Sequence, residues 1–463
     1  MSQDVTLRGQ NGIAINADST YNAVQTISKG ITTTNFTQAD FTLDSFQRLR
    51  VSEPRIAFEA SFSAQTPASA SSIWEATAVA SGTVALTGNL FGTTLSTTTS
   101  TGSGYWVQSY NHVRYAPGIS TLLRFTFCFN SLLSGLTSRL GMFTDQGTFP
   151  STSGDGVFIE ASGSVISFVI RSMASGAGSE MRVNQTVWNI DKMDGTGASG
   201  VSLDWTKTQH LVMEYQWLGV GTIRFGFETG AGGTIWAHQV NAVNTATTSW
   251  SRTGSLPLRA ECYTSTAQTV PGTLTLVNCV VMQEGDVNAL RGWRYFGNNS
   301  GTTVRLGGTA AGLYPVMSLR AASTNDLTKR TRFIPVSITV TLAAVATGAT
   351  SVQVSLLTFP TPNTGATFAV QPAGSGVTVD IAATATTAVT GTSIWNTVIP
   401  NVVGTYTFDL SSMPDNQNVA GYNAAGTVSI SGSSVLTLAA GPLTGTASAG
   451  ASIAAALNWK EIV

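Results

Sequence analysis

Charged and reactive side chains are scarce in this sequence. Asp, Glu, Lys and Arg together make up only 10% of its 463 residues, and there are 3 His and 3 Cys. Active sites usually show as clusters of titratable side chains, so this composition argues against an enzyme. Lys and Arg number 23 against 24 Asp and Glu. Duplex-binding proteins carry a basic excess or a basic stripe, so we expect no nucleic acid partner.

Metal and cofactor motifs are also lacking. Cys128, Cys262 and Cys279 have no CxxC spacing and no neighbouring His, which argues against a zinc site. Buried free thiols are the default expectation for all three, although the sequence leaves a Cys262–Cys279 disulfide open. No Gly-x-x-x-x-Gly-Lys-Ser/Thr motif occurs. We therefore expect no cofactor and no bound metal.

Long apolar runs and targeting signals are missing as well. No run reaches the roughly 18 apolar residues of a membrane helix, so no membrane span is expected. The N-terminal residues 1–5 show no basic region followed by an apolar run, so no signal peptide is expected. Amphipathic helices are nearly absent, and Val287–Arg291 is the one short helical turn that the sequence suggests.

Short β-type runs are what the sequence does contain. Hydrophobic residues make up 42% of the chain, which is enough for a substantial core. In Ile223–Phe227 the apolar residues occupy every second position, as in a strand with one buried face. Many such runs, separated by Gly, Ser, Asn and Asp, predict an all-β antiparallel sandwich. The Thr- and Ser-rich stretch within 74–103 is either a β-ribbon along a partner or a loop, and we interpret it as the ribbon.

Composition divides the chain into four parts. Residues 1–45 are polar and predict an N-terminal extended arm, and residues 46–300 predict a large β-sandwich. Residues 301–335 are interpreted as a linker, and residues 336–463 as a smaller C-terminal β-sandwich or barrel. The charged residues from Val336 onward are Asp380, Asp409, Asp415, Lys460 and Glu461. Thr-rich strands with so little charge aggregate when their edges are exposed, so we expect this surface to be buried in an oligomer.

One region combines carboxylates with aromatic rings, as sugar-binding sites do. Its candidates for glycan binding are Trp188, Asp191, Asp194, Trp205 and Trp217. Aromatic faces can pack on sugars, and paired carboxylates can hydrolyse glycosidic bonds. The simpler interpretation is that the rings fill the sandwich core and the acids cap turns. The run that begins at Asp191 lacks the Asp-x-Asp-x-Asp-Gly spacing of a calcium loop.

The three histidines offer little for nucleophilic catalysis. His112, His210 and His238 are accompanied by no Gly-x-Ser-x-Gly elbow at a plausible strand-to-helix turn. His210 lies in a strand-like run, and His238 follows Trp236 among alternating apolar residues. We therefore expect structural roles for these side chains.

One segment and several later blocks carry a family resemblance. Asp44–Pro54, with the sequence D-S-F-Q-R-L-R-V-S-E-P, resembles the D-A-F-G-R-L-R-V-S-x-P signature of a family of tailed-bacteriophage virion structural proteins. Gln47 stands where the family often has Gly. Further blocks that resemble the family, in the same order, are Tyr105–Ser109, Val113–Gly118, Gly154–Phe158, Val169–Ser172, Gln185–Gly195, Leu203–Gln209, Gln216–Gly221, Leu256–Arg259 and Leu313–Arg320. The arm and the region after Pro335 match much less clearly.

The resemblance implies a particle component with a lectin-like β-sandwich rather than a catalyst. The leading hypothesis is an oligomeric fibre or spike protein of the tail or baseplate, with a trimer favoured. Its location would be the virion, after assembly in the host cytoplasm, and its partners other copies and other phage structural proteins. Two alternatives stay open: a head decoration protein, of the cement or head-fibre kind, and a receptor-binding module for a host surface glycan.

Overall fold

The computed structural model describes residues 6–8, 14–16, 54–63, 66–67, 74–87, 91–145, 149–150, 152–230, 233–284, 293–298, 304–306, 312–321, 332–345, 348–361, 368–370, 377–380, 388–410, 435–443 and 451–462. Within these residues the chain is all-β, as predicted, and its strands pair in antiparallel fashion. The one helical element in this part is the 3₁₀ turn η2 (Gln185–Val187). None of the described segments forms an apolar helix long enough to cross a membrane.

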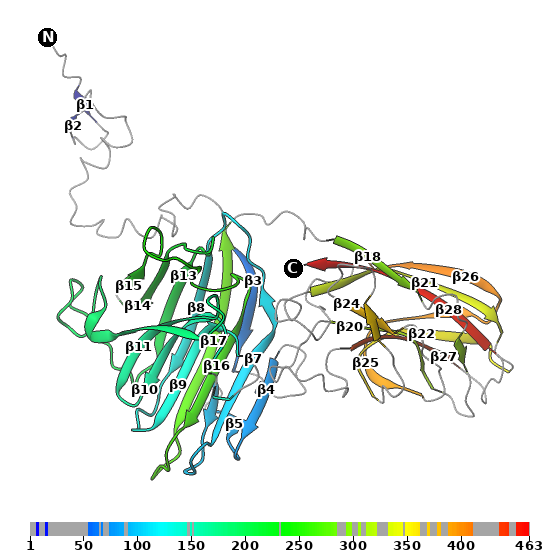
Figure 1. Ribbon diagram of the computed structural model, residues 1–463, viewed down its shortest axis with the longest axis horizontal. Helices are drawn as coiled ribbons and strands as arrows, with labels where there is room; N and C mark the ends of the chain where they lie inside the picture. The colour runs from blue at the N-terminus through cyan, green and yellow to red at the C-terminus, as the bar shows by residue number, and fades with distance from the viewer. Residues whose placement is uncertain are drawn as a thin grey trace.

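Two facing sheets form the first unit, coloured blue to green in Figure 1. The strands of the seven-stranded sheet are, in spatial order, β12 (Ser179–Asn184), β11 (Val165–Ser172), β10 (Gly156–Ser162), β9 (Leu136–Phe143), β16 (Leu256–Thr264), β7 (Gly104–Val113) and β4 (Trp74–Val79). Those of the eight-stranded sheet are β15 (Thr234–Val240), β14 (Ile223–Glu228), β13 (Gln209–Tyr215), β8 (Thr121–Cys128), β17 (Thr273–Glu284), β6 (Thr93–Ser96) and β5 (Thr83–Leu86), with β3 (Pro54–Ser61) also paired to β17.

The core of the first unit lies between these sheets. Because side chains alternate along a strand, Val157 and Ile159 of β10 enter the core while Phe158 joins a separate cluster. Aromatic rings join the two sheets at the centre. The ring of Phe168 on β11 stacks on Trp188 and on Phe225 of β14, with centroids 4.3 Å apart in both pairs.

Two further sheets form the second unit, which has its own core of buried residues from Tyr314 to Trp459. One sheet contains, in order, β18 (Trp293–Asn298), β28 (Ala451–Ile462), β21 (Arg332–Ala344) and β26 (Gly404–Asp409), with β19 (Val304–Leu306) also paired to β28. The other contains β23 (Phe368–Val370), β24 (Val377–Asp380), β20 (Tyr314–Ala321), β27 (Val435–Pro442), β22 (Ser351–Thr361) and β25 (Thr390–Pro400). In the described residues both sheets are open, so the unit is a sandwich rather than a barrel.

The predicted boundaries between the parts differ from the structure. β18, β19 and β20 precede Val336, in ranges predicted as the end of the first sandwich and as a linker, yet they pair with β28 and β27 of the second unit. Membership of a unit depends on which core the apolar residues enter, and Leu319 of β20 is fully buried in the second.

Several local predictions have different outcomes. The Thr-rich stretch is ordered as predicted, but β5 and β6 pair with each other and β6 with β17, so they belong to the chain's own sheet. The alternative of a Cys262–Cys279 disulfide is wrong, because both residues are buried free cysteines. In the predicted arm, β1 (Thr6–Arg8) and β2 (Ala14–Asn16) pair in antiparallel fashion. The rest of residues 1–45, residues 44–53 of the signature, and the turn 287–291 lie outside the described residues.

Candidate functional site

The residues that the sequence suggested for glycan binding lie in different environments. Trp188 and Trp205 are buried in the first core, 3% and 9% exposed, with ring centroids 6.3 Å apart. The Trp205 indole N–H donates to the Gln185 side-chain oxygen at 2.9 Å. Trp217 is half-buried against the Tyr115 ring, and its N–H donates to the Ser251 carbonyl. The first two rings fill the core, as in the simpler interpretation, so their faces are closed to a sugar.

The two carboxylates of this set organise a loop. Asp191 is buried, and its carboxylate accepts backbone N–H groups of Met193 and Ser199 at 2.8 and 2.7 Å. Asp194 is exposed and accepts from the backbone and hydroxyl of Thr196. These hydrogen bonds hold the pKa of Asp194 below its ordinary value. Both acids therefore stabilise turns, which is the role of short acidic side chains in irregular structure.

Two of the histidines lie on separate strands of the eight-stranded sheet. His210 on β13 contacts Glu228 of β14, with Nδ1 3.0 Å from the carboxylate. His238 on β15 accepts the Asn189 backbone N–H at Nδ1, at 3.1 Å. Burial lowers the pKa of both imidazoles. The neutral ring of His238 fixes the loop that precedes Asp191, a structural role as predicted.

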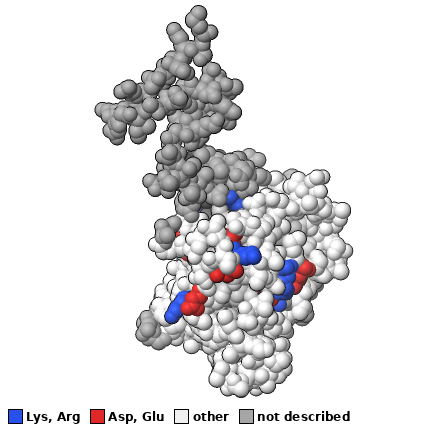
Figure 2. Space-filling view, turned by 90° about the vertical axis from the view of Figure 1, so that its left-hand side faces the viewer, with Lys and Arg blue, Asp and Glu red and all other residues white. Residues whose placement is uncertain are grey.

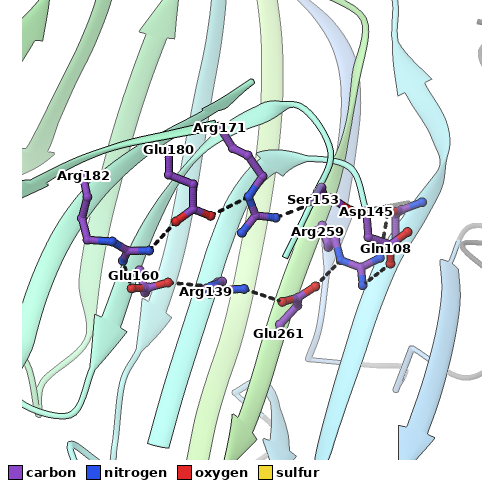
Figure 3. Close-up of polar contacts among 10 residues, drawn as sticks. All are labelled: Gln108, Arg139, Asp145, Ser153, Glu160, Arg171, Glu180, Arg182, Arg259 and Glu261. Carbon is purple, nitrogen blue, oxygen red and sulfur yellow. Dashed lines mark hydrogen bonds and ion pairs between the residues drawn. The ribbon is translucent and has the colours of Figure 1, made fainter. Parts of the chain in front are cut away.

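A network of charged side chains that the sequence analysis did not predict crosses the outer face of the seven-stranded sheet (Figure 3). Strand register creates it, because Arg139 on β9 lies directly opposite Glu160 on β10 and Glu261 on β16. Arg139 Nε donates to Glu160 at 2.6 Å, and its Nη1 lies 3.5 Å from Glu261. Arg259 Nε donates to the other Glu261 oxygen at 2.6 Å, and Arg182 of β12 also contacts Glu160.

Both ends of the network are paired as well. Arg259 Nη2 lies 2.6 Å from the Asp145 carboxylate, and its Nη1 donates to Gln108 at 2.9 Å. At the other end, Arg171 of β11 donates from Nε to Glu180 at 2.7 Å. The side chains of Arg259 and Arg171 are fully buried, whereas that of Glu180 is 28% exposed. The two terminal arginines are thus buried, and the partly exposed members of the network, Glu180 and Arg182, lie on β12 at the edge of the sheet.

Aromatic rings cover the guanidinium groups. Arg259 lies over the Trp106 ring at 4.4 Å from its centroid, and Arg171 over Phe158 at 4.9 Å. Arg139 lies 5.3 Å from the centroid of Tyr263. Guanidinium groups are weakly hydrated and stack well on rings, so arginine suits this buried position better than lysine would.

The pairing limits what these carboxylates can do chemically. Burial alone would lower the pKa of Arg139, but Glu261, Tyr263 and Glu160 together raise it above its ordinary value. Burial alone would raise the pKa of Glu180, but Arg171 and Arg182 lower it below its ordinary value. A general acid needs a carboxyl group that keeps its proton near neutral pH, whereas the contacts of Glu180 favour its ionised form. Among the described residues, no group of three or more His, Cys, Asp or Glu could hold a metal ion.

A second buried pair lies on the outer face of the eight-stranded sheet. Glu214 of β13 and Arg224 of β14 are register partners with a contact of 2.5 Å, and Ser120 donates to Glu214 at 2.8 Å. Arg224 stacks over Trp236 at 4.4 Å. Figure 2 shows the same pairing of opposite charges at the surface, where most visible acidic and basic groups lie next to each other on an otherwise uncharged face.

One more buried acid, Asp155, ties three segments together. Its carboxylate accepts the backbone N–H groups of Met173 and Arg252 at 3.0 Å and the Arg252 Nε at 2.8 Å. Asp155 belongs to one of the blocks that carry the family resemblance. Single charges inside apolar strands, such as Arg139 in Leu136–Phe143, were the sequence signal for such buried groups.

The solved structures that resemble this chain do so only weakly. No protein-family model matches the chain, and no curated protein sequence matches it. Among solved structures, an endo-β-1,4-glucuronan lyase from the fungus Trichoderma reesei is 11% identical with a TM-score of 0.34, covering 49% of this chain and 95% of the lyase. A β-glucanase from Bacillus licheniformis is 15% identical with a TM-score of 0.30, over 50% and 98% of the two chains. A legume lectin-like domain from Entamoeba histolytica is 9% identical with a TM-score of 0.28, over 45% and 89%. Such values carry no argument about activity, and the sandwich architecture is given by the strand pairing itself.

Proposed function

We propose that this chain is a non-catalytic, oligomeric structural subunit of a tailed-phage virion, acting as a tail- or baseplate-associated fibre or spike. The observation that carries the proposal is the resemblance of Asp44–Pro54, and of nine later blocks in the same order, to the family of virion structural proteins.

The positions of the resembling blocks support a structural role. Asp155 ties three segments, Asp191 holds a loop, and Trp205 fills the core. Arg171 and Arg259 are buried members of the charge network. All five side chains are engaged within the protein, where they stabilise the fold.

The burial and pairing of the carboxylates support the non-catalytic part of the proposal. Glu160, Glu214 and Glu261 are almost completely buried, and each contacts at least one arginine. Glycoside hydrolysis needs two carboxyl groups that face a sugar, one of them protonated. Incubation of the purified chain with host polysaccharide should release no reducing ends, and sustained release would refute this part of the proposal.

The location is tested on the particle itself. Antibodies raised against the purified chain are applied to purified virions, and gold-labelled secondary antibody is viewed by electron microscopy. Label at the tail or baseplate with a few to a few tens of copies per particle is expected. Label over the head, with hundreds of copies, would favour the head decoration alternative, and particles without the protein would refute a virion role.

A further inference from the structure

Both sheets of the second unit end on strands that carry almost no charge. β25 ends one sheet and β26 the other, and each is paired on one side only among the described residues (Figure 1). The stretch 388–409, which contains both strands and the turn between them, has Asp409 as its single charged residue. Free-standing proteins usually guard a bare edge with lysine, proline or a bulge, because its N–H and C=O groups can pair with another chain. β25 ends at Pro400 and has register shifts against β22, whereas β26 has none of these features.

Exposed apolar side chains continue this surface around the turn. Val398 of β25 is 49% exposed, and Val402 and Val403 of the turn are 58% and 61% exposed. The Asn401 backbone N–H donates to the Thr350 carbonyl and the Val402 N–H to the Pro400 carbonyl, which anchors the turn. An uncharged edge with exposed valines has the composition of an interface rather than of a solvated border.

The core behind this edge is incompletely covered. Tyr406 and Phe408 of β26 alternate with exposed threonines and are only half-buried against the second core. Trp395 of β25, also half-buried, contacts the Phe408 ring with centroids 5.2 Å apart. Three aromatic rings therefore lie where both sheets stop, and a further strand beside β26 would complete their burial.

We propose that β26 pairs antiparallel with β26 of a second copy of this chain, about a two-fold axis at Thr407. Residues directly opposite each other in an antiparallel pair place their side chains on the same face of the sheet. A two-fold axis between two identical strands must therefore pass between two copies of the same residue. With the axis at Thr407, Tyr406 lies opposite Phe408 of the second copy, and the reverse, so both rings gain a neighbour. Thr405 lies opposite Asp409 of the second copy, and no two like charges meet.

A second copy suits this edge better than a different protein of opposite charge. Gly404–Phe408 offers no charge for such a partner to complement, whereas its alternation of threonine and aromatic residues is self-complementary about Thr407. The inference rests on the oligomeric part of the proposed function and names its contact. A two-fold contact makes dimers, so it favours an even-numbered assembly over the trimer expected from the sequence.

The test places charges on the proposed axis. Thr407→Lys and Thr407→Glu are made in the full chain, and mass is measured by light scattering after size exclusion over a dilution series. Wild type is expected to be a dimer, and each variant should dissociate more readily because like charges lie directly opposite. An equimolar mixture should re-form the dimer as a Lys–Glu pair, with a dissociation constant about tenfold below that of either variant alone.

Thr339→Lys is the matched control. Thr339 lies opposite Thr407 on β21, and their hydroxyl groups are 3.2 Å apart, so this change breaks the same hydrogen bond and adds the same charge one strand inward. It should leave the dimer intact. A monomeric wild type, a trimer, an equal effect of both lysines, or no rescue in the mixture would each overturn the inference.

Failure here is distinguishable from failure of the proposed function. If the chain is found in virions but its assembly ignores position 407, the edge contact is wrong and the virion role stands. If the mixture rescues the dimer but virions lack the protein, the contact stands and the virion role is wrong. Circular dichroism of each variant verifies that the strands are retained.

Discussion

The buried charge network allows a quantitative prediction for Glu261→Gln. The Glu261 carboxylate is fully buried and contacts Arg259 at 2.6 Å and Arg139 at 3.5 Å. Removing one partner of a buried ion pair costs about 3–5 kcal/mol, because the other charge stays desolvated. Arg259 keeps Asp145 and Arg139 keeps Glu160, so we expect about 3 kcal/mol, the lower end of this range.

Glu228→Gln is the matched control on the opposite sheet. Glu228 also contacts two side chains, Arg124 and His210, but all three are about a third exposed, at 27%, 33% and 34%. Solvent screens such a contact, so its loss should cost roughly 0–1 kcal/mol. The two variants make the same chemical change and differ mainly in burial.

Urea titration of the full chain, with hydrogen exchange as the local reporter, measures the difference. With a slope of about 2–3 kcal/mol per molar urea, Glu261→Gln should lower the midpoint of the first unit by about 1 M. Peptides from β9 and β16 report that unit, and peptides from β21 serve as the internal reference. Equal midpoints for the two variants would refute the claim that burial makes this network stabilising.

Four further outcomes follow from the structure. Trp205→Ala should destabilise the first unit by about 3–5 kcal/mol in urea titration, because the buried indole leaves a cavity. Leu218→Ala, at an exposed position, should stay within about 0.5 kcal/mol of wild type. Equal effects of the two substitutions would contradict a core role for the indole. The pKa of Glu180 is depressed in the folded state, so the stabilisation from its carboxylate is present above the ordinary pKa of 4.5 and is lost as pH falls below that value. In Glu180→Gln the free energy of unfolding should therefore depend less on pH on the acid side, and an unchanged pH profile would refute this assignment. The pKa of His238 is lowered by burial, so its neutral form stabilises the fold above pH 6.5, and this contribution is lost as pH falls from 6.5 through the folded pKa. Hydrogen exchange at the Asn189 backbone N–H, normalised for intrinsic rates, should therefore accelerate at pH 5. No acceleration would argue against a neutral imidazole as the acceptor. Burial raises the pKa of the Cys262 thiol to about 12, and all three cysteines are buried and free. A thiol reagent should therefore detect no thiol in the native chain and three after denaturation. A single reactive thiol after denaturation would mean that a disulfide forms.

Local patterns were sufficient to predict the class of the fold. Alternation of apolar residues, as in Ile223–Phe227, depends only on the two-residue period of a strand, so it is visible without knowing the partner strand. The default expectation of buried free cysteines and the simpler interpretation of Trp188 and Trp205 as core residues were also correct. Both rest on the general tendency of such side chains to leave water.

Unit boundaries needed the tertiary structure. Residues of β20 lie in a stretch that composition marks as a linker, yet Leu319 pairs with Leu436 across more than a hundred residues. Pairing between distant strands is decided by the whole set of competing partners, and no local pattern encodes it. The end of one unit and the start of the next therefore stayed hidden in the sequence.

The sequence by itself determined that this protein is all-β, poor in charge and built around apolar strands, because these properties are local and compositional. Only the tertiary structure decided that Arg139 lies between Glu160 and Glu261, and that β25 and β26 both end their sheets in the part of the chain that the structure describes. Register brings charges together from strands far apart in the chain, and topology decides which strands are left without a neighbour. Both are consequences of how the strands pair, which is a property of the folded chain as a whole.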